Sequence, residues 1–284
     1  MSQTLVGSRY ELHVAREGAA ESKSIRDYLS LYPGDTDEAK AKDVVGFVHS
    51  YEVGSTVDGP GLRFVGFLTG CPLRCQFCHN PDTWHKHNGT PVPVSQAMRQ
   101  IAKYTTALKV SGGGVTLSGG EPMVQRAFVS QIFRRCKELG LHTAIETAGA
   151  LGAKFTDREL QDIDLHILDI KGGDADTFEK VCGRPQKATL EFAQRLSTLG
   201  RPAWIRFVLV PGLTDGHENV EKLADIVAGL KNVERVEILR FHQMGRDKWH
   251  KLGVRYELEN FEPPSAELTA RVRSQFRRRG LTVY

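Results

Sequence analysis

Three cysteines fall within one eight-residue stretch, Cys71-Pro-Leu-Arg-Cys75-Gln-Phe-Cys78. A loop this short can place three thiolates around a single inorganic core. A 4Fe-4S cluster with three cysteine ligands keeps one iron open, whereas electron-transfer ferredoxins complete the cluster with four cysteines. The alternative is zinc, with His79 or His85 as fourth ligand, although structural zinc sites usually come as two spaced pairs of ligands. The spacing therefore predicts metal ligation and favours a cluster over zinc.

The other two of the five cysteines, Cys136 and Cys182, stand alone in the sequence, and Cys136 lies in a helical pattern beside Phe133. An odd number of cysteines and a reducing compartment both disfavour disulfides. Free cysteine often behaves as a small buried hydrophobic residue. We expect this role for both residues, which leaves metal ligation to the three clustered thiols.

Short β-branched apolar runs alternate with helical patterns from Val45 onward. The predicted strands are 61–69, 115–118, 143–146, 165–170, 203–210 and 233–241, and the helical patterns are 95–108, 124–139, 190–199, 220–229 and 266–279. Each strand is followed by a segment able to form a helix, which implies parallel strands with right-handed crossovers. Six such units predict an α/β fold, a partial (β/α)6 TIM-like barrel of parallel strands with the helices outside.

Polar residues fall where the predicted strands end, and in such barrels chemistry takes place at the carboxyl ends of the strands. They are Cys71, Glu121, Glu146, Asp169, Lys171 and His242, with Arg206 inside the fifth strand. Gly119 and Gly120 precede Glu121 and allow the backbone to approach a ligand closely, because glycine has no Cβ. Asp169 and Lys171 are two positions apart, so a strand places both on one face. Segments distant in the sequence are thus expected to converge on one barrel mouth.

The Cys-x-x-x-Cys-x-x-Cys spacing, with Phe77 before the last cysteine, resembles the signature of the radical S-adenosylmethionine superfamily. Further segments resemble the activating enzymes of glycyl-radical enzymes: GSTVDGPGLR at 54–63, CHN at 78–80, SGGGVTLSGGEP at 111–122, WIR at 204–206 and LRFH at 239–242. The likeness runs from about residue 45 to residue 284. No cysteine lies between Cys78 and Cys136, so the ferredoxin-like insertion of many such activating enzymes is missing.

The resemblance implies a 4Fe-4S cluster on Cys71, Cys75 and Cys78, with S-adenosylmethionine bound at its open iron. In the family, the Gly-Gly-Glu segment holds the methionine amino group. The cofactor-binding residues implied in this chain are Phe77, His79, Gly119, Gly120, Glu121, Glu146, Asp169, Lys171, Arg206 and His242. Lys171 suits the methionine carboxylate or the ribose, and Arg206 suits the same carboxylate because a guanidinium binds it bidentately.

The alternative for these charges is a purely structural network that stabilises the barrel end. His242, which the resemblance places beside the adenine, is equally well interpreted as a structural histidine. The segment Glu146-Thr147-Ala148-Gly149 resembles the acidic-Thr-x-Gly segment of the family, which implies a monovalent cation near the cofactor. Some relatives have Asp and Asn where this chain has Glu146 and Ala148, so the chain departs from the pattern at this site.

The implied activity is that of an oxidoreductase that cleaves S-adenosylmethionine reductively and abstracts hydrogen from a glycine Cα of a partner protein. The single-cluster form is similar to the type that acts on pyruvate formate-lyase, through the glycine loop of that partner. Flavodoxin or ferredoxin is the implied electron donor. An open six-strand barrel suits an extended peptide, which is recognised largely through its backbone. Three alternatives stay open: an activase of another glycyl-radical enzyme, a small-molecule radical enzyme such as a deazapurine synthase, and a non-catalytic metal-binding module.

The composition, with 40% apolar and 25% charged residues, is that of an ordinary globular protein. A net charge of +4 without a basic stripe does not predict nucleic acid as a partner. The chain has neither a membrane-length apolar run nor a signal peptide, which predicts a cytoplasmic protein that does not bind membranes. Residues 1–44 are polar and form a predicted N-terminal extension to a barrel domain over 45–284. We expect a monomer.

Overall fold

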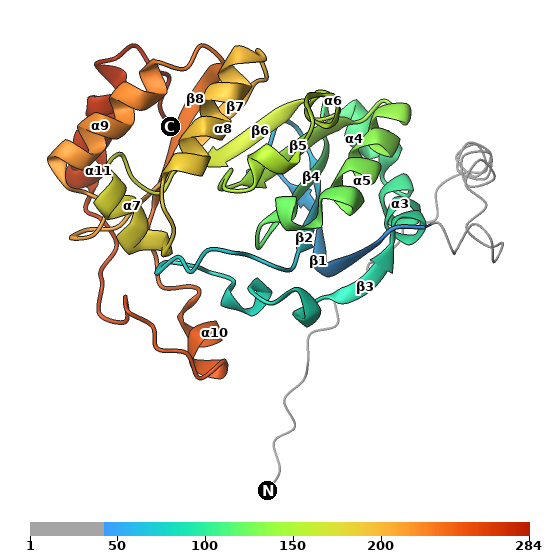
Figure 1. Cartoon of the computed structure of the whole chain (residues 1–284), viewed down its shortest axis with the longest axis horizontal. Helices are drawn as coiled ribbons and strands as arrows, with labels where there is room; N and C mark the ends of the chain where they lie inside the picture. The colour runs from blue at the N-terminus through green and yellow to red at the C-terminus, as the bar shows by residue number, and fades with distance from the viewer. Residues whose placement is uncertain (1–42) are drawn as a thin grey trace, which may run out of the picture. The chain divides into compact units, whose positions relative to one another are not determined.

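The computed structural model describes residues 43–284, which belong to a single compact unit. The N-terminal extension predicted over 1–44 therefore lies outside the described residues, apart from its last two positions. The barrel predicted from residue 45 onward can be followed through the whole described part of the chain (Figure 1).

One sheet of eight strands runs in the order β3-β1-β2-β4-β5-β6-β7-β8. Six of these strands are parallel to one another and coincide with the six predicted strands: β2 (Arg63–Leu68), β4 (Gly114–Gly119), β5 (His142–Thr147), β6 (Leu165–Asp169), β7 (Ala203–Leu209) and β8 (Val233–Arg240). The predicted fold class is thereby confirmed. Within residues 43–284, the edge strands β3 and β8 do not pair with each other, so the barrel is open (Figure 1).

Two strands were not predicted, and both are antiparallel additions at the β2 end of the parallel strands. The strand β1 (Val45–Ser55) pairs with β2 and with β3 (Thr90–Pro93). Much of β1 is exposed, which weakens the apolar alternation from which strands are predicted. The short β3 contains two prolines, which a sheet tolerates only at an edge.

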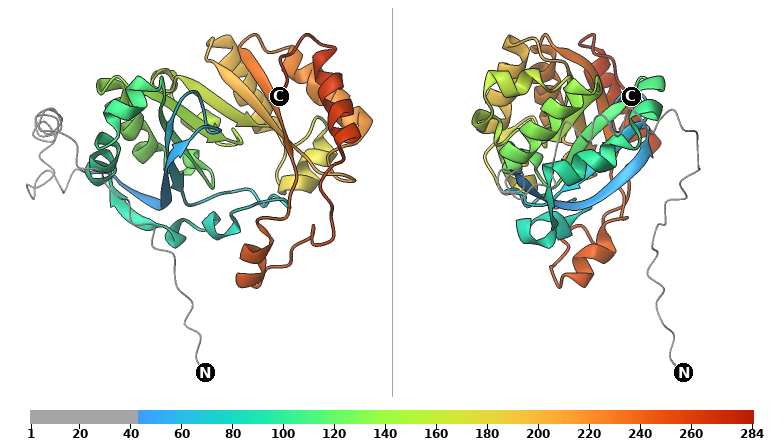
Figure 2. Two further views of the ribbon diagram at one scale, coloured as in Figure 1. Left: turned by 180° about the vertical axis from the view of Figure 1, so that it is seen from behind. Right: turned by 90° about the vertical axis from the view of Figure 1, so that its right-hand side faces the viewer.

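Helices lie along the outside of the curved sheet (Figure 2). They are α3 (Val94–Ala102), α4 (Thr105–Val110), α5 (Arg126–Glu138), α6 (Asp157–Gln161), α7 (Ala175–Cys182), α8 (Lys187–Thr198), α9 (His217–Ala228) and α11 (Ala266–Arg277), whereas α10 (Arg246–Lys251) lies away from the sheet (Figure 1). Short 3-10 turns are η1 (Pro81–Thr83), η2 (Lys86–Asn88), η3 (Pro122–Gln125) and η4 (Gly152–Lys154). The helix predicted over 95–108 is divided into α3 and α4. The unpredicted α6, α7 and α10 are too short to produce a clear helical period.

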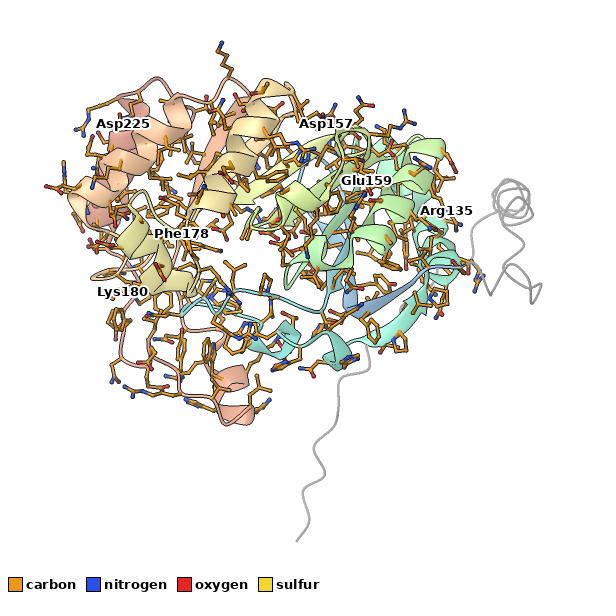
Figure 3. All side chains as sticks on the ribbon, in the orientation of Figure 1. Arg135, Asp157, Glu159, Phe178, Lys180 and Asp225 are labelled. Atoms are coloured by element: carbon orange, nitrogen blue, oxygen red, sulfur yellow. The ribbon has the colours of Figure 1, made fainter. Side chains whose placement is uncertain are left out.

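Local sequence signals begin and end several of these helices. Thr156 and Glu159 form a capping box at the start of α6. The Asp174 carboxylate caps α7, which ends at Gly183 in the left-handed conformation. Charged side chains such as Glu159 and Asp225 lie on the outer helices (Figure 3), where they pair with arginines from neighbouring elements.

The parallel strands are the most deeply buried part of the sheet. Val65, Val115, Ile145, Ile167 and Ile205 are all fully buried, one from each of five adjacent strands. Strands buried on both faces form a rigid wall, and their carboxyl ends are therefore fixed relative to one another. In the described part of the chain, no helix is both long and apolar enough to span a membrane.

Candidate active site

A cavity of about 410 Å³ lies where the parallel strands end. The cysteine loop lines it together with residues that close or follow β4, β5, β6 and β8. The predicted site residues among its lining are Cys71, Cys75, Phe77, Cys78, His79, Gly119, Gly120, Glu146, Asp169, Lys171 and His242. Glu121 and Arg206 are not part of the lining.

The cysteine loop is held by backbone hydrogen bonds from two sides. The amides of Arg74 and Gln76 donate to the carbonyls of Cys182 and Val181, each at 2.9 Å, which attaches the loop to the last turn of α7. The Cys71 amide donates to the Trp84 carbonyl at 3.0 Å. The loop conformation is thus fixed by contacts that do not involve the thiols themselves.

Burial raises the pKa of all three clustered thiols, that of Cys71 to about 12, and Lys171 only partly offsets this for each of them. The free thiols are therefore protonated at neutral pH, and a bound metal has to displace their protons. Within residues 43–284, no three Cys, His, Asp or Glu side chains lie close enough to hold a single metal ion. Thiolates that each bind a different iron of a cluster do not need to meet at one point.

Gly119 and Gly120 allow the end of β4 to approach the chain that leaves β2. A Cβ on Gly119 would lie 2.3 Å from the Leu68 carbonyl oxygen, and one on Gly120 would lie 2.6 Å from the Gly70 oxygen. Gly119 also has a φ of 112°, which other residues rarely adopt. The close approach made by these glycines is thus to the protein's own backbone beside the cysteine loop.

Glu121 lies behind the cavity wall and is 1% exposed. One of its carboxylate oxygens accepts hydrogen bonds from the Thr147 hydroxyl at 2.7 Å and the Met123 amide at 3.1 Å. The other accepts one from the Ala148 amide at 3.0 Å. Burial raises the pKa of Glu121, and these three donors oppose that effect. The side chain ties the end of β4 to the end of β5.

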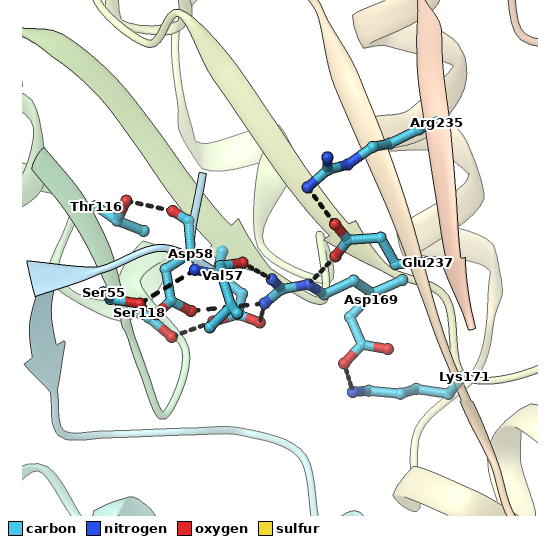
Figure 4. Close-up of polar contacts among 11 residues, drawn as sticks. Ser55, Val57, Asp58, Thr116, Ser118, Asp169, Lys171, Arg235 and Glu237 are labelled. Atoms are coloured by element: carbon cyan, nitrogen blue, oxygen red, sulfur yellow. Dashed lines mark hydrogen bonds and ion pairs between the residues drawn. The ribbon is translucent and has the colours of Figure 1, made fainter. Parts of the chain in front are cut away.

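Arg206 is buried at the centre of a charge network, and its partners Asp58 and Glu237 are labelled in Figure 4. Its Nε donates to Glu237 at 2.7 Å, and its Nη1 pairs with Glu146 and lies 3.8 Å from Asp58. Its Nη2 donates to the Val57 carbonyl at 2.5 Å. Burial acts to raise the pKa of Glu146, but Arg206 and a hydrogen bond from Ser118 outweigh it, so that this pKa lies below its usual value. Glu146 therefore belongs both to the network and to the cavity lining.

Asp169 and Lys171 face each other at the end of β6, and the lysine ammonium pairs with the Oδ2 atom of Asp169 (Figure 4). The Oδ1 atom of Asp169 is buried without a hydrogen-bond partner. Lys171 also lies 5.2 Å from the centre of the Phe77 ring. Burial opposes the charge on Lys171, but Asp169 outweighs that effect and raises the lysine pKa.

His79 and His242 stack with ring centres 4.2 Å apart. The His79 Nε2 atom lies 3.3 Å from the His242 carbonyl oxygen, whereas the Nδ1 atom of His242 is buried without a partner. Burial lowers the pKa of His79. The two rings join the cysteine loop to the chain that leaves β8.

Glu237 and Trp84 are among the residues at the site that were not predicted. Glu237 is the register partner of Arg206 on the neighbouring strand β8. A carboxylate inside a strand of a parallel sheet is itself a signal, because such strands are normally apolar throughout. Trp84 lines the cavity close to the cysteine loop, and a tryptophan in an otherwise polar segment could have been noticed.

The residues present fit the two implied cofactors. Three thiols on one wall match a cluster with an open iron. The buried, unpartnered Oδ1 of Asp169 and Nδ1 of His242 belong to residues that line the same cavity, and buried polar atoms of this kind normally have a partner. A polar ligand beside the cluster would supply one.

A family model described as a 4Fe-4S single cluster domain matches residues 57–174. A crystal structure of a domain of pyruvate-formate lyase-activating enzyme from Bacteroides vulgatus is 26% identical, with a TM-score of 0.52, covering 61% of this chain and 98% of that one. Streptococcus suis SuiB bound to S-adenosylmethionine is 16% identical, with a TM-score of 0.58, covering 80% of this chain and 50% of that one. The latter likeness concerns the fold alone.

Two curated relatives are more similar in sequence. The pyruvate formate-lyase-activating enzyme of Staphylococcus epidermidis is 45% identical over 229 residues, which are 78% of this chain and 91% of the relative. The pyruvate formate-lyase 1-activating enzyme of Escherichia coli K12 is 40% identical over 232 residues, which are 81% of this chain and 94% of the relative. With this identity over nearly the whole length of both relatives, the chain belongs to the family of pyruvate formate-lyase activating enzymes.

Proposed function

We propose that the cavity at the barrel mouth is where this chain, as a member of its family, activates pyruvate formate-lyase. The cofactors are a 4Fe-4S cluster and S-adenosylmethionine, whose reductive cleavage at the cluster leads to hydrogen abstraction from a glycine Cα of the partner and leaves a glycyl radical there. The observation that carries the proposal is the single cavity that combines three thiols with buried, charged strand ends. The protein's part is to bind, orient and exclude water.

We assign the cluster to Cys71, Cys75 and Cys78. In the same cavity, Glu146, Asp169 and Lys171 are suited to the charged methionine end of the cofactor. An ammonium requires acceptors such as the free Oδ1 of Asp169, and a carboxylate requires a cation such as Lys171. Phe77, His79 and His242 line the cavity and provide the apolar and stacking surface for the nucleoside. 

Arg206 and Glu121 do not line the cavity and act through residues that do. Arg206 holds Glu146 by an ion pair, and Glu121 holds the backbone of Ala148 by a hydrogen bond at 3.0 Å. Since both side chains end on residues that line the cavity, they position those residues for the cofactor. Direct contact of Arg206 or Glu121 with the cofactor is the alternative assignment, which a structure with the cofactor bound would test.

The monovalent cation implied near Glu146 stays a prediction. One oxygen of Glu146 already pairs with Arg206, and the other accepts a hydrogen bond from Ser118. A cation there has to share or displace these partners. A dependence of S-adenosylmethionine affinity on potassium concentration, measured at constant ionic strength, would support the site, and the absence of that dependence would exclude it.

The partner protein presents its glycine loop at the open side of the barrel. The opening follows from edge strands that do not meet within residues 43–284. Flavodoxin or ferredoxin is the proposed electron donor, because the cluster takes one electron at a time. We also propose a cytoplasmic monomer, in keeping with the expectation from the sequence. Elution from a sizing column as a stable dimer would contradict the monomer.

The division into an extension over 1–44 and a barrel over 45–284 is likewise a proposal. It is supported by β1, which begins at Val45, and by the compact unit that contains the described residues. Deletion of residues 1–42 should leave the cluster and the activation rate unchanged. A deletion variant without the brown chromophore would contradict the division.

The function is tested with anaerobically reconstituted protein, S-adenosylmethionine and pyruvate formate-lyase from the same organism. The expected result is a doublet glycyl-radical signal in electron paramagnetic resonance. With the partner deuterated at the glycine Cα, deuterium should appear in the 5'-deoxyadenosine. If S-adenosylmethionine is cleaved but no deuterium is transferred and no radical forms, a small-molecule radical reaction takes the place of the activation.

A further inference from the structure

The short helix α10 (Arg246–Lys251) lies directly against the chain that follows the last cysteine. The Trp249 indole Nε1 donates a hydrogen bond to the Cys78 carbonyl at 2.8 Å. The Lys248 ammonium donates to the Asn80 side-chain oxygen at 2.7 Å and pairs with Asp82 at 3.1 Å. All three contacts fall within the five residues from Cys78 to Asp82.

Gly245 brings the start of α10 into close contact with the same segment. A Cβ at this position would lie 2.7 Å from the His79 Cα and 3.1 Å from the Cys78 carbonyl oxygen. Only glycine fits such an approach without a shift of the backbone. A six-residue helix has little stability of its own, so α10 is maintained by these contacts rather than by its own hydrogen bonds.

Aromatic packing extends the contact from Cys78 to Cys71. The Trp249 ring is 4% exposed and meets Trp84 edge to face, with ring centres 5.0 Å apart. The Trp84 carbonyl in turn accepts the hydrogen bond from the Cys71 amide at 3.0 Å. Two of the three clustered cysteines are therefore tied to α10, one directly and one through Trp84.

We propose that α10 is a clamp on the cluster loop, in which Trp249 and Lys248 are positioning residues that fix the backbone of Cys78 and thereby retain the cluster. The proposal rests on the assignment of Cys78 as a cluster ligand under the proposed function. Groups that orient a ligand residue commonly change metal affinity by about 10- to 100-fold when they are removed. Neither residue touches the reacting atoms.

The test measures the rate at which the reconstituted holoenzyme loses iron to a ferrous chelator without oxygen. Trp249→Phe keeps most of the ring and removes the hydrogen bond to Cys78, so iron should leave about tenfold faster. Trp204→Phe is the matched control, because Trp204 is 7% exposed and donates a hydrogen bond to Glu234 at 2.9 Å, and neither residue lines the cavity. This control should release iron at the wild-type rate.

Lys248 is a second position to test, and it should tolerate substitution because its side chain is 38% exposed. Lys248→Met should accelerate iron release several-fold, and Lys248→Arg, which keeps a cation and donors, should restore most of the retention. The electron paramagnetic resonance line shape of the reduced cluster should change in Trp249→Phe and not in Trp204→Phe. A merely structural role would not move this spectrum.

The clamp would be overturned if Trp249→Phe released iron at the wild-type rate. It would also be overturned if Trp204→Phe released iron as fast as Trp249→Phe. Activation of pyruvate formate-lyase is measured on the same wild-type preparation. A wild-type protein that makes no glycyl radical contradicts the proposed function, whereas the comparison of iron-release rates among the variants does not depend on that reaction. The two failures are thus distinguishable.

Discussion

Burial raises the pKa of the three clustered thiols, and Lys171 offsets this effect only in part. At the strand ends, burial also acts to raise the pKa of Glu146, but there the ion pair with Arg206 and a hydrogen bond from Ser118 outweigh it. Cys71, Cys75 and Cys78 are held through their backbone. Glu146 is held through its charged oxygens, by Arg206 and Ser118. The comparison shows that the three thiols have no ion-pair partner within residues 43–284, whereas the Glu146 carboxylate is already paired with Arg206.

The sharpest separation of the two sides comes from replacing the cysteines one at a time. Cys71→Ala, Cys75→Ala and Cys78→Ala should each abolish the brown chromophore after anaerobic reconstitution, because a 4Fe-4S cluster with one open iron requires all three cysteine ligands. Cys136→Ala and Cys182→Ala are the controls, since both thiols are fully buried and outside the cavity lining. Loss of the cluster in the Cys182 variant would contradict the three-ligand assignment, as measured by iron and sulfide content.

A large loss of stability is expected from the other side of the cavity. Arg206→Met leaves the buried carboxylate of Glu146 without its cation and removes one of the two arginines that pair with Glu237, which should lower the free energy of unfolding of the cluster-free protein by about 3–5 kcal/mol. Urea unfolding measures this loss. The control is Arg126→Met, whose side chain is 44% exposed and whose pair with Glu159 should contribute about 1 kcal/mol or less. Equal losses in the two variants would mean that the network is not effectively buried.

Cofactor affinity should respond to Lys171 without loss of the cluster. Lys171→Ala removes one charge-assisted contact, worth about 1.5–3 kcal/mol, or roughly a 10- to 100-fold weaker binding of S-adenosylmethionine. Calorimetry on the reconstituted protein gives the affinity. Lys187→Ala, at a position that is 83% exposed on α8, should bind normally. Normal binding in the Lys171 variant would place the methionine end of the cofactor elsewhere.

The smallest effect concerns pH. Because Glu146 has a pKa below its usual 4.5, its ion pair stabilises the folded state fully above that value, and the contribution is lost as the pH falls through the lower folded-state pKa. The difference in unfolding free energy between wild type and Glu146→Gln should therefore be widest at neutral pH and narrow below about pH 4.5. Exposed Glu262→Gln is the control. A difference that stays constant with pH would show that Glu146 is not held ionised by Arg206.

Much of this molecule was predictable from the sequence because its signals are local. The three cysteines and the six parallel strands required only spacing and apolar runs, and the strand ends placed Glu146, Asp169 and Lys171 at one mouth. The two antiparallel strands β1 and β3 were missed, since an exposed strand and a strand with two prolines lack the apolar alternation of a buried one.

The sequence by itself determined the fold class and the family and predicted the cluster loop, because each depends on residue type at short, fixed separations. Only the tertiary structure decided what each charge contacts. Arg206 meets Glu237 because β7 and β8 pair in that register, and Glu121 turns to Thr147 rather than into the cavity. Likewise, α10 reaches Cys78 across 171 positions of sequence. Such contacts depend on how whole elements pack, which no local pattern specifies.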